Sequence, residues 1–322
     1  MSAVRPNAAG DQALLVSLTL NPTLDTVTTI DRVVDTHKMR CGPTQIHPGG
    51  GGINVSRVTH RLGVPSLAVF PTGGLTGQRV CALLAEEEVP IDAVPTEVET
   101  RGALAVRETS TGKDFRFTLP MEALPEAVWR DCVQRFQAHA AGQAYAVISG
   151  SLPDGVPTSV YADLARWARV QGVRLVIDSS GPVLNAALAE GVFLFKPSLR
   201  ELCELVGRPL GTQQEWRAAA RECIAQGQTE VVALTLGSEG ADLIGTDFAW
   251  RSPALNVNVM TTVGAGDSFV GGLLTELVRG RPLAEAYRTA MAASAAALMA
   301  PGTALCRPED VRALRAQVDI FD

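Results

Sequence analysis

Short runs of β-type residues alternate with amphipathic helical stretches along most of this 322-residue chain. Short apolar runs bounded by turn residues are typical of buried strands, whereas apolar residues repeating at the helical period predict helices packed against them. Such alternation indicates an α/β fold, in which helices cover both faces of a parallel sheet. The predicted strands are 13–20, 67–70, 144–148, 174–177, 193–195 and 231–236, and the clearest helical patterns are 128–138, 159–171 and 213–226.

Two regions do not follow this alternation. Residues 26–46 and 94–119 are strand-like and polar, with no helical pattern inside them. Residues 103–107 and 114–119 are expected to form a hairpin, because a Thr-Gly turn lies between them. We therefore predict a single domain over all 322 residues, in which the two regions form a discontinuous β lid over one end of the main sheet.

The composition limits the partners of the chain. It carries 28 Lys and Arg against 34 Asp and Glu, so a broad basic surface for nucleic acid is not expected, and an anionic ligand needs a local basic pocket. The six cysteines and four histidines show no metal-ligand spacing, and no apolar run is long enough to span a bilayer. We expect a reduced cytoplasmic protein that binds neither nucleic acid nor membrane.

A glycine-rich turn lies between a polar run at 256–260, predicted as a strand, and a helical run at 268–279. The small residues of 261–266 allow the backbone to approach a ligand closely, and the free amides at the helix start favour an anion such as phosphate. Asp267 would lie beside that phosphate, where it could accept a proton from an attacking hydroxyl. The other interpretation is that Asp267 only caps the helix.

Residues 262–268 resemble the second signature of the ribokinase-like (PfkB-type) carbohydrate kinases. Residues 48–55 resemble the first signature, 20–25 resemble the N-terminal sugar-binding strand end, and the similarity runs from about Ser17 to Cys306. The resemblance implies an ATP-dependent sugar kinase with a three-layer α/β/α fold, a mostly parallel central sheet and a small β-sheet lid. The resemblance also implies the catalytic residues. Asp267 would be the base, and the backbone amides around the phosphate would be those of Gly264, Ala265 and Gly266.

Four consecutive glycines precede a helical run at 53–62 and permit close approach of the backbone to a polar ligand. Asn54 offers both a donor and an acceptor there, and Asp25, just after the first strand, could accept bonds from two sugar hydroxyls. A flexible turn capped by Asn54 and a solvated loop acid at Asp25 are the alternatives. The resemblance favours a sugar site made of Asp25, Gly50, Gly51, Asn54 and Ser151.

The predicted lid carries cations that a phosphorylated sugar requires and a plain sugar does not. Arginine can bind phosphate through two parallel hydrogen bonds, and lysine acts as a point charge. An exposed strand cation that discourages edge pairing is the alternative for each of them. The positions that match the phosphosugar branch of the family are Lys38, Arg40, Arg101 and Arg116.

The nucleotide site is assigned from the resemblance. Residues 235–240 follow a strand-type run and resemble the ATP-binding turn of the family, although a tight loop between strands is the alternative. Ser198 stands where the family usually carries the Asn of Asn-x-x-Glu, so nucleotide or metal affinity is expected to differ, and Glu201 would help to place magnesium through water. The implied ATP-binding residues are Lys196, Ser198, Thr235, Gly237, Ser238, Gly240 and Ala295.

The resemblance also implies a potassium site. Residues 298–304 resemble the loop that closes over the adenine and, in several relatives, supplies carbonyl groups to a potassium ion. Carbonyl ligands leave no side-chain signal in a sequence. The candidate potassium ligands are Thr261, Val263, Ala297, Ala300, Gly302 and Ala304.

One position of the glycine loop bears on the substrate. Relatives that act on fructose 1-phosphate or tagatose 6-phosphate usually carry a lysine where Gly51 stands, so this loop, with residues 176–181, most resembles the branch that phosphorylates the 1-hydroxyl of fructose 6-phosphate. Kinases of the other two sugars, and a catalytically idle sugar-phosphate sensor on the same fold, are the alternatives. Lids of this family usually pair, so a homodimer through the lid is expected.

Overall fold

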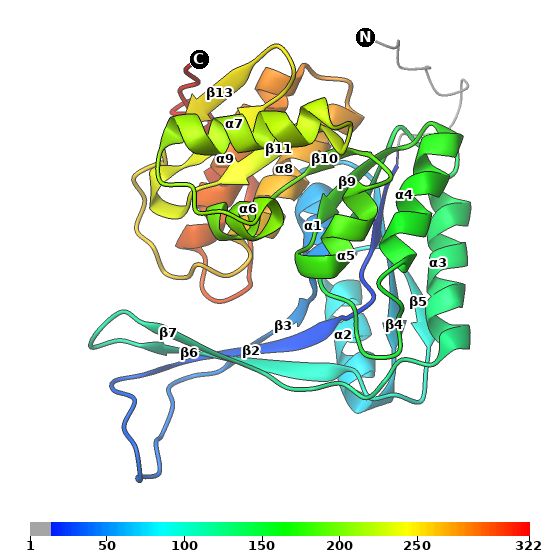
Figure 1. The fold of residues 1–322 in the computed structure, drawn as a ribbon. Coiled ribbons are helices and arrows are strands. Elements are labelled where there is room, and N and C mark those ends of the chain that lie inside the picture. The colour runs from blue at the N-terminus through cyan, green and yellow to red at the C-terminus, as the bar shows by residue number, and fades with distance from the viewer. Residues whose placement is uncertain (1–13) are drawn as a thin grey trace.

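The computed structural model describes residues 14–322, which form a nine-stranded sheet and a separate four-stranded sheet with helices around them (Figure 1). Residue 13, at the start of the predicted first strand, lies outside this range. The strand order in the large sheet is β13-β12-β11-β10-β9-β8-β1-β4-β5. Its strands are β1 (Leu15–Leu18), β4 (Ser66–Thr72), β5 (Ile91–Pro95), β8 (Tyr145–Ser149), β9 (Arg174–Asp178), β10 (Val192–Phe195), β11 (Thr229–Thr235), β12 (Ala241–Ile244) and β13 (Ala249–Ser252).

The strands from β11 to β5 in this order run parallel, and β12 and β13 continue the sheet as antiparallel strands. Every residue of β1, β8 and β10 is buried. Continuous apolar strands of this kind are expected in a parallel sheet, because helices cover both of its faces. The predicted mostly parallel sheet is confirmed.

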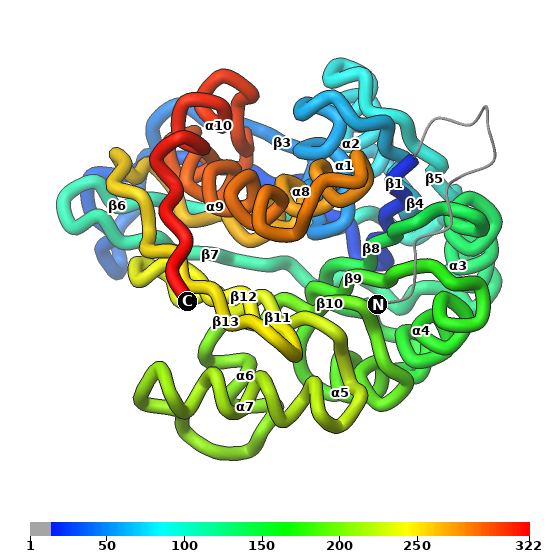
Figure 2. The backbone as a smooth tube through the Cα atoms, turned by 90° about the horizontal axis from the view of Figure 1, so that it is seen from above, coloured from blue at the N-terminus to red at the C-terminus, as the bar shows by residue number. Residues whose placement is uncertain are grey.

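Helices on the two faces complete three layers, as the two views of the chain show (Figures 1 and 2). Tyr161 and Trp216 belong to the core under α3 to α7, and Phe269 and Tyr287 belong to the core under α1, α8, α9 and α10. A third, smaller core around Phe70 holds α2 against the sheet. The helices are α1 (Gly51–Arg61), α2 (Gly74–Glu86), α3 (Glu126–Ala140), α4 (Val160–Gln171), α5 (Gly181–Leu188), α6 (Leu199–Val206), α7 (Gln213–Ala225), α8 (Ala265–Val278), α9 (Leu283–Met299) and α10 (Pro308–Arg315).

The four-stranded sheet is the predicted lid, and it projects from one end of the body (Figure 1). Its order is β3-β2-β6-β7, in which β2 and β6 are parallel and the other pairs are antiparallel. The predicted hairpin is confirmed, with Ala103 opposite Thr118 and Arg107 opposite Asp114. The lid strands are β2 (Thr23–Ile30), β3 (Gln45–Gly49), β6 (Arg101–Glu108) and β7 (Asp114–Thr118).

Two details of the predicted lid are wrong. Residues 94–95 belong to β5 at the edge of the large sheet, where they pair with β4, so the second part of the lid begins only at Arg101. Lys38 and Arg40, which we expected among strand residues, are exposed in the connection between β2 and β3. The strand-like composition of this connection therefore does not lead to strand pairing.

The run at 256–260 was predicted as a strand and is an extended connection without a strand partner. Its end is held by α9, because the Met260 amide donates a hydrogen bond to the Leu298 carbonyl at 2.7 Å. The connection before α8 and the loop after α9 therefore lie side by side. Within residues 14–322, no helix combines the length and the apolar character needed to cross a membrane.

Candidate active site

Polar side chains lie where the parallel strands of the large sheet end. Ser149 ends β8, Asp178 ends β9, and Lys196 directly follows β10. Open α/β sheets bind ligands outside this carboxyl edge, where the loops leave a crevice. The edge brings opposite charges together, since Lys196 Nζ lies 3.1 Å from Asp178 Oδ1.

Asp267 lies within the first turn of α8, which begins at Ala265, earlier than the predicted start at 268. The N-cap of this helix is Gly264, whose φ of 77° is left-handed and free of strain for a glycine. No side chain caps this end, so the interpretation of Asp267 as only a helix cap is wrong. The free amides and the positive end of the helix dipole leave an anion site beside Asp267.

The Asp267 carboxylate has the electrostatics of a general base. The pKa of Asp267 is raised to about 7, chiefly by burial and also by the charge of Asp178, while a hydrogen bond from Asn54 and the charge of Lys196 oppose the rise. Asn54 Nδ2 donates that bond to Asp267 Oδ2 at 2.8 Å. Below about pH 7 the carboxyl group is protonated and cannot take a proton, and above it the carboxylate is ready to do so.

Lys196 is a buried cation among acidic side chains. Burial favours its neutral form, but the carboxylates of Asp178, Glu201 and Asp267 outweigh burial and raise the pKa of Lys196. A Cβ atom on Gly266 would lie 3.3 Å from Lys196 Nζ, so the ammonium group rests against the glycine turn. The same turn that offers free amides therefore also has a fixed positive charge beside it.

Asp25 lies half-buried on β2, against the glycine loop that precedes α1. Burial raises the pKa of Asp25, against a hydrogen bond from Thr23 and the charges of Arg57 and Arg101. A Cβ atom on Gly49 would overlap the Asp25 carboxylate, so only a glycine permits this approach. The predicted neighbourhood of Asp25 and the glycine loop is present.

The glycine loop packs against the end of β8. Gly50 is the N-cap of α1, with φ of 113°, a left-handed value that other residues rarely adopt. A Cβ atom on Gly51 would overlap the Ser149 hydroxyl, so this position has no room for a side chain while Ser149 keeps its place. Ser151 lies in the following turn, where its Oγ accepts a hydrogen bond from Asn21 Nδ2 at 3.1 Å.

Two of the predicted lid cations point toward these loops. Arg101 is half-buried near Asp25, and within residues 14–322 its buried Nε has no hydrogen-bond partner. Arg116 Nη2 donates to Thr262 Oγ1 at 2.9 Å, which connects β7 to the glycine turn. A buried donor on a cation is costly unless a ligand satisfies it, so Arg101 marks a site for an anion.

Residues 235–240 form the turn from β11 to β12, which contains the short 3-10 helix η1 (Gly237–Glu239). Ser198 lies beside this turn, because it pairs with Thr235 in an isolated bridge. Ser198 and Glu201 form a capping box at the start of α6, in which Glu201 Oε2 accepts from the Ser198 amide at 2.8 Å and from its hydroxyl at 2.9 Å. Serine in place of the expected asparagine therefore has a structural role, since serine is a favoured helix cap.

The acidic residues fit a divalent cation that is held mostly through water. Residues 14–322 contain no group of three or more side chains able to enclose a metal ion. Asp178 and Glu201 interact electrostatically and flank Lys196. Their hard oxygens suit magnesium, which keeps several waters and is usually shared with the phosphates of a substrate.

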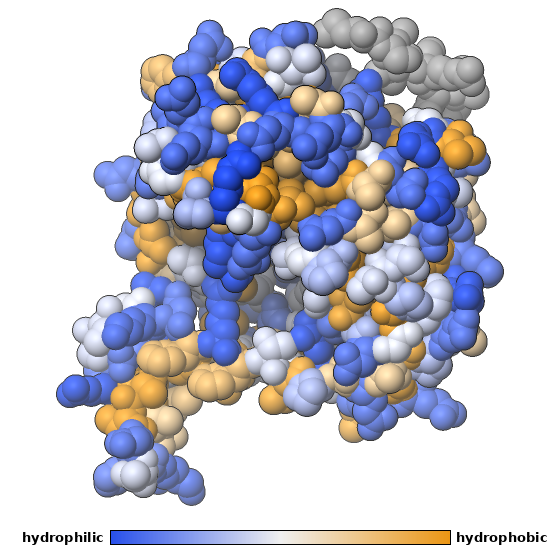
Figure 3. All heavy atoms as spheres, viewed as in Figure 1, coloured by the Kyte–Doolittle hydropathy of each residue, from blue (hydrophilic) through white to orange (hydrophobic). Residues whose placement is uncertain are grey.

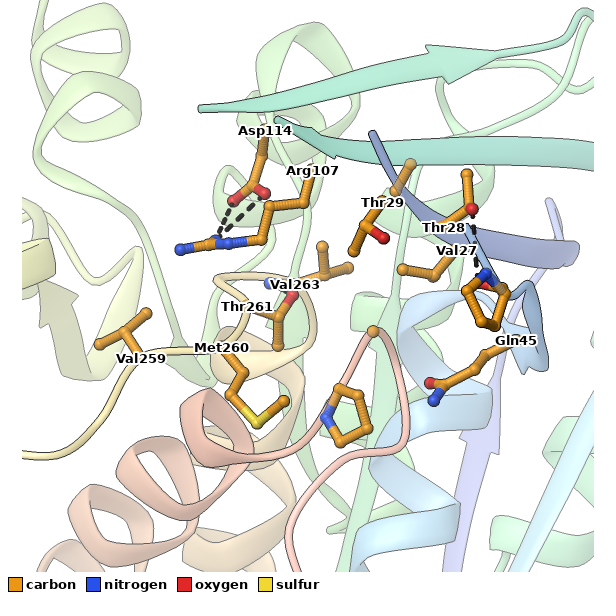
Figure 4. Close-up of a pocket in the computed structure, with 14 residues that line it drawn as sticks. Val27, Thr28, Thr29, Gln45, Arg107, Asp114, Val259, Met260, Thr261 and Val263 are labelled. Carbon is orange, nitrogen blue, oxygen red and sulfur yellow. Dashed lines mark hydrogen bonds and ion pairs between the residues drawn. The ribbon is translucent and has the colours of Figure 1, made fainter. Parts of the chain in front are cut away.

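A cavity of about 290 Å³ lies between the lid and the two connections next to α8 and α9 (Figure 4). Thr261, Val263 and Gly302, three of the predicted potassium ligands, line it. On the lid side it is lined by Arg107 and Asp114, which form an ion pair at 3.3 Å. The connection before α8 and the loop after α9 therefore share the lining of one cavity.

The predicted loop at 298–304 needs correction. It begins only after Met299, where α9 ends, so Ala295 and Ala297 are buried residues of the helix. The Ala304 carbonyl accepts a hydrogen bond from Arg61 Nη1. One acceptor position of this carbonyl is therefore already occupied by a protein donor.

The comparisons with known proteins agree with this geometry. A family model described as pfkB family carbohydrate kinase matches residues 18–310, which include every predicted site residue. The chain belongs to this family. As a pfkB-family carbohydrate kinase it is a phosphotransferase that acts on a sugar hydroxyl, and the predicted enzyme class is confirmed.

Two relatives of this pfkB-family kinase bear the name ATP-dependent 6-phosphofructokinase isozyme 2. The protein of Mycobacterium tuberculosis H37Rv is 43% identical over 297 residues, which are 92% of this chain and 87% of that protein. The protein of Escherichia coli K12 is 38% identical over 303 residues, or 94% of this chain and 98% of that protein. A crystal structure of phosphofructokinase-2 from Escherichia coli in complex with substrates and products matches with a TM-score of 0.90, covers 94% of this chain and 98% of its own, and confirms the three-layer fold.

Two residues of the site were not predicted. Asp178 is an acid at a strand end, which was a usable signal because ligands bind at that edge. Arg57 is a charged residue on the buried face of α1, and its side chain is 0% exposed. A single arginine in a helix gives little signal in a sequence, because most arginines are solvated.

Proposed function

We propose that the chain is an ATP-dependent 6-phosphofructokinase that phosphorylates the 1-hydroxyl of fructose 6-phosphate. The observation that carries this proposal is the half-buried Arg101 beside Asp25, with an Nε donor that has no partner in the described part of the chain. A carboxylate next to an unsatisfied guanidinium suits a sugar that already carries a phosphate. The names of the two relatives support the same substrate.

The geometry supports a direct transfer. Asp267 accepts the proton of the 1-hydroxyl as that oxygen forms a bond to the γ-phosphorus of ATP, and the bond from this phosphorus to the β–γ bridging oxygen breaks. ADP leaves, fructose 1,6-bisphosphate forms, and Asp267 later releases the proton to water. Lys196 and the amides of 264–266, which lie beside one another, would neutralise the charge on the transferred group.

Metal ions would assist this step. We propose that Asp178 and Glu201 hold magnesium through water, where it would neutralise phosphate charge. A potassium ion among carbonyls of Thr261, Val263 and Gly302 would add positive charge near the glycine turn.

Two alternatives lose support. A lysine at position 51, usual in relatives that act on fructose 1-phosphate or tagatose 6-phosphate, would overlap the Ser149 hydroxyl here. The idle sensor rested on Ser198, which the structure explains as the cap of α6. A base with a pKa of about 7 at Asp267 also fits catalysis better than passive binding.

The test is an ADP-release assay with ATP and three sugars. We expect kcat/KM for fructose 6-phosphate to exceed the values for tagatose 6-phosphate and fructose 1-phosphate by roughly 100-fold, since misplaced hydroxyls leave buried polar groups unpaired. The variant Asp267→Asn, purified in the same way, controls for contaminating kinases. A preference for either of the other sugars would refute the proposed substrate.

We also propose that two copies pair through the outer face of the lid. Ile46, Thr26, Leu104 and Phe117 are cross-strand neighbours, so one row crosses all four strands. Arg116 reaches inward to Thr262, and alternation along β7 therefore points Phe117 outward. Phe117 is 53% exposed. Hydrophobic side chains are visible on the surface of the lid (Figure 3).

Phe117→Asp is expected to give a monomer in sedimentation velocity runs in which the unaltered protein is a dimer. A charge in an apolar interface lacks a partner and disfavours association. Leu75→Asp is the matched control, because Leu75 is 79% exposed at the start of α2 and is not part of the four lid strands. A monomeric unaltered protein, or a dimeric Phe117→Asp variant, would contradict this proposal.

A further inference from the structure

Arg57 is among the largest fully buried side chains of the described chain. Its Nη1 donates to the side-chain oxygen of Asn54 at 3.0 Å, to the Pro48 carbonyl at 3.0 Å and to the Thr303 carbonyl at 3.1 Å. These acceptors belong to α1, to the end of β3 and to the loop after α9. Arg57 therefore joins three segments that meet around the sugar and phosphate loops.

The positive charge of Arg57 is balanced from behind. Its Nη2 lies 2.6 Å from Glu87 Oε1, and its Nε lies 3.0 Å from Glu87 Oε2. Glu87 also pairs with Arg61, at 2.7 Å, one turn later on α1. Because Glu87 compensates the buried charge, the Nη1 edge of Arg57 is free to serve the backbone and Asn54.

The bond to Arg57 decides how the Asn54 amide is oriented. An asparagine amide has one accepting and one donating end, whereas a guanidinium group only donates. With Asn54 Oδ1 on Arg57, its Nδ2 must face Asp267, where it donates at 2.8 Å. The reversed amide would set its NH₂ group against the guanidinium and its oxygen against the carboxylate, and both contacts would be repulsive.

This orientation determines what remains available on the base. Asp267 Oδ2 accepts from Asn54, and no other hydrogen bond to this carboxylate exists within residues 14–322. Its Oδ1 is left for the hydroxyl of the substrate. A donor to the charged form also lowers the pKa of Asp267 against the effect of burial.

We propose that Arg57, supported by Glu87, is a positioning residue that fixes the Asn54 amide and thereby orients Asp267. Arg57 touches neither the transferred phosphate nor the base directly, so it acts through Asn54. The inference rests on the proposed kinase reaction for its readout. It concerns orientation, however, and does not depend on which phosphosugar is the substrate.

The test compares Arg57→Gln with the unaltered enzyme in kcat, in KM for ATP, and in the pH profile of kcat/KM. We expect kcat to fall about 10- to 100-fold, as for other lost supports of reacting groups, with KM for ATP nearly unchanged. The acid limb, near pH 7 in the unaltered enzyme, should move to higher pH because the base loses a donor to its charged form. Arg57→Lys, which can still donate to Asn54, should recover part of kcat.

A double-mutant cycle adds a second readout. If Arg57 acts through Asn54, then adding Arg57→Gln to an enzyme that already carries Asn54→Ala should lower kcat by little more than about twofold. Arg61→Gln is the matched control, because Arg61 also pairs with Glu87 but makes no contact with Asn54, and it should leave the pH profile unshifted. The proposal would be overturned if Arg57→Gln lowered kcat by the same factor with and without Asn54→Ala. It would also be overturned if the pH profile of Arg57→Gln were unshifted.

A failure of folding does not remove the test. Where Arg57→Gln alone does not fold, Arg57→Gln with Glu87→Gln removes the buried charge together with its partially exposed partner and serves for the same measurements. If the chain phosphorylated another sugar, the proposed function would fail while the shift of the acid limb could still be measured with that sugar. The two proposals can therefore be refuted separately.

Discussion

Asp267→Asn is expected to lower kcat by about 10²- to 10⁴-fold, with KM for both substrates nearly unchanged. Asparagine matches aspartate in size and can still accept the hydrogen bond from Asn54, but its amide cannot take the proton of the sugar hydroxyl. Because no folding contact is lost, the thermal unfolding midpoint should stay close to that of the unaltered protein. Steady-state kinetics and a thermal melt check both expectations.

Asp247→Asn is the matched control for this change. Asp247 is exposed in the turn between β12 and β13, so its substitution should leave kcat unaffected. A variant at Asp267 that kept more than about a tenth of the normal kcat would remove the aspartate from the role of base.

Arg101→Gln is expected to raise KM for fructose 6-phosphate about 10- to 150-fold, with little change in KM for ATP. Hydrogen bonds to charged groups contribute about 1.5–3 kcal/mol, and glutamine removes both the charge and the paired donors of the guanidinium group. The effect should be restricted to the sugar, because Arg101 lies beside Asp25 and away from the turn at 235–240. Initial rates at varied concentrations of each substrate separate the two constants.

Arg107→Gln controls for a general loss of positive charge in the lid. Arg107 lies on the same strand and the same face as Arg101, but it is already paired with Asp114. Its substitution should change KM for the sugar less than about threefold, within the range of exposed ion pairs. Equal effects of the two substitutions would mean that Arg101 only adds to the overall charge of the lid.

The main sheet could be predicted because its strands are buried on both faces and are therefore apolar throughout. The edges were harder to predict. β5 at one edge is only partly buried, and its residues 94–95 were assigned to the lid. Residues 256–260 have a strand-like composition but form a connection that is held by α9. Tertiary contacts, and not β propensity alone, decide whether such a segment pairs with a strand.

The glycine turn at the start of α8 could be predicted, because a motif places small residues next to the charged Asp267 there. The motif does not contain the partners of that residue. Asn54 was predicted as a ligand of the sugar, and in this structure its amide donates to Asp267 and accepts a hydrogen bond from Arg57. Such links depend on how distant segments pack, which a single sequence does not show. The roles of the lid cations, the metal ligands and the dimer remain predictions.

The hydrogen bond between Asn54 and Asp267 joins residues that are 213 positions apart. During synthesis on a ribosome, the helix that carries Asn54 is complete long before the helix that carries Asp267 has left the exit tunnel. The base cannot be oriented until nearly the whole chain has emerged, and a nascent fragment that already holds the sugar loop has no means of transferring phosphate. Recovered activity therefore reports a late step of folding that joins distant segments, after contacts between near neighbours have formed.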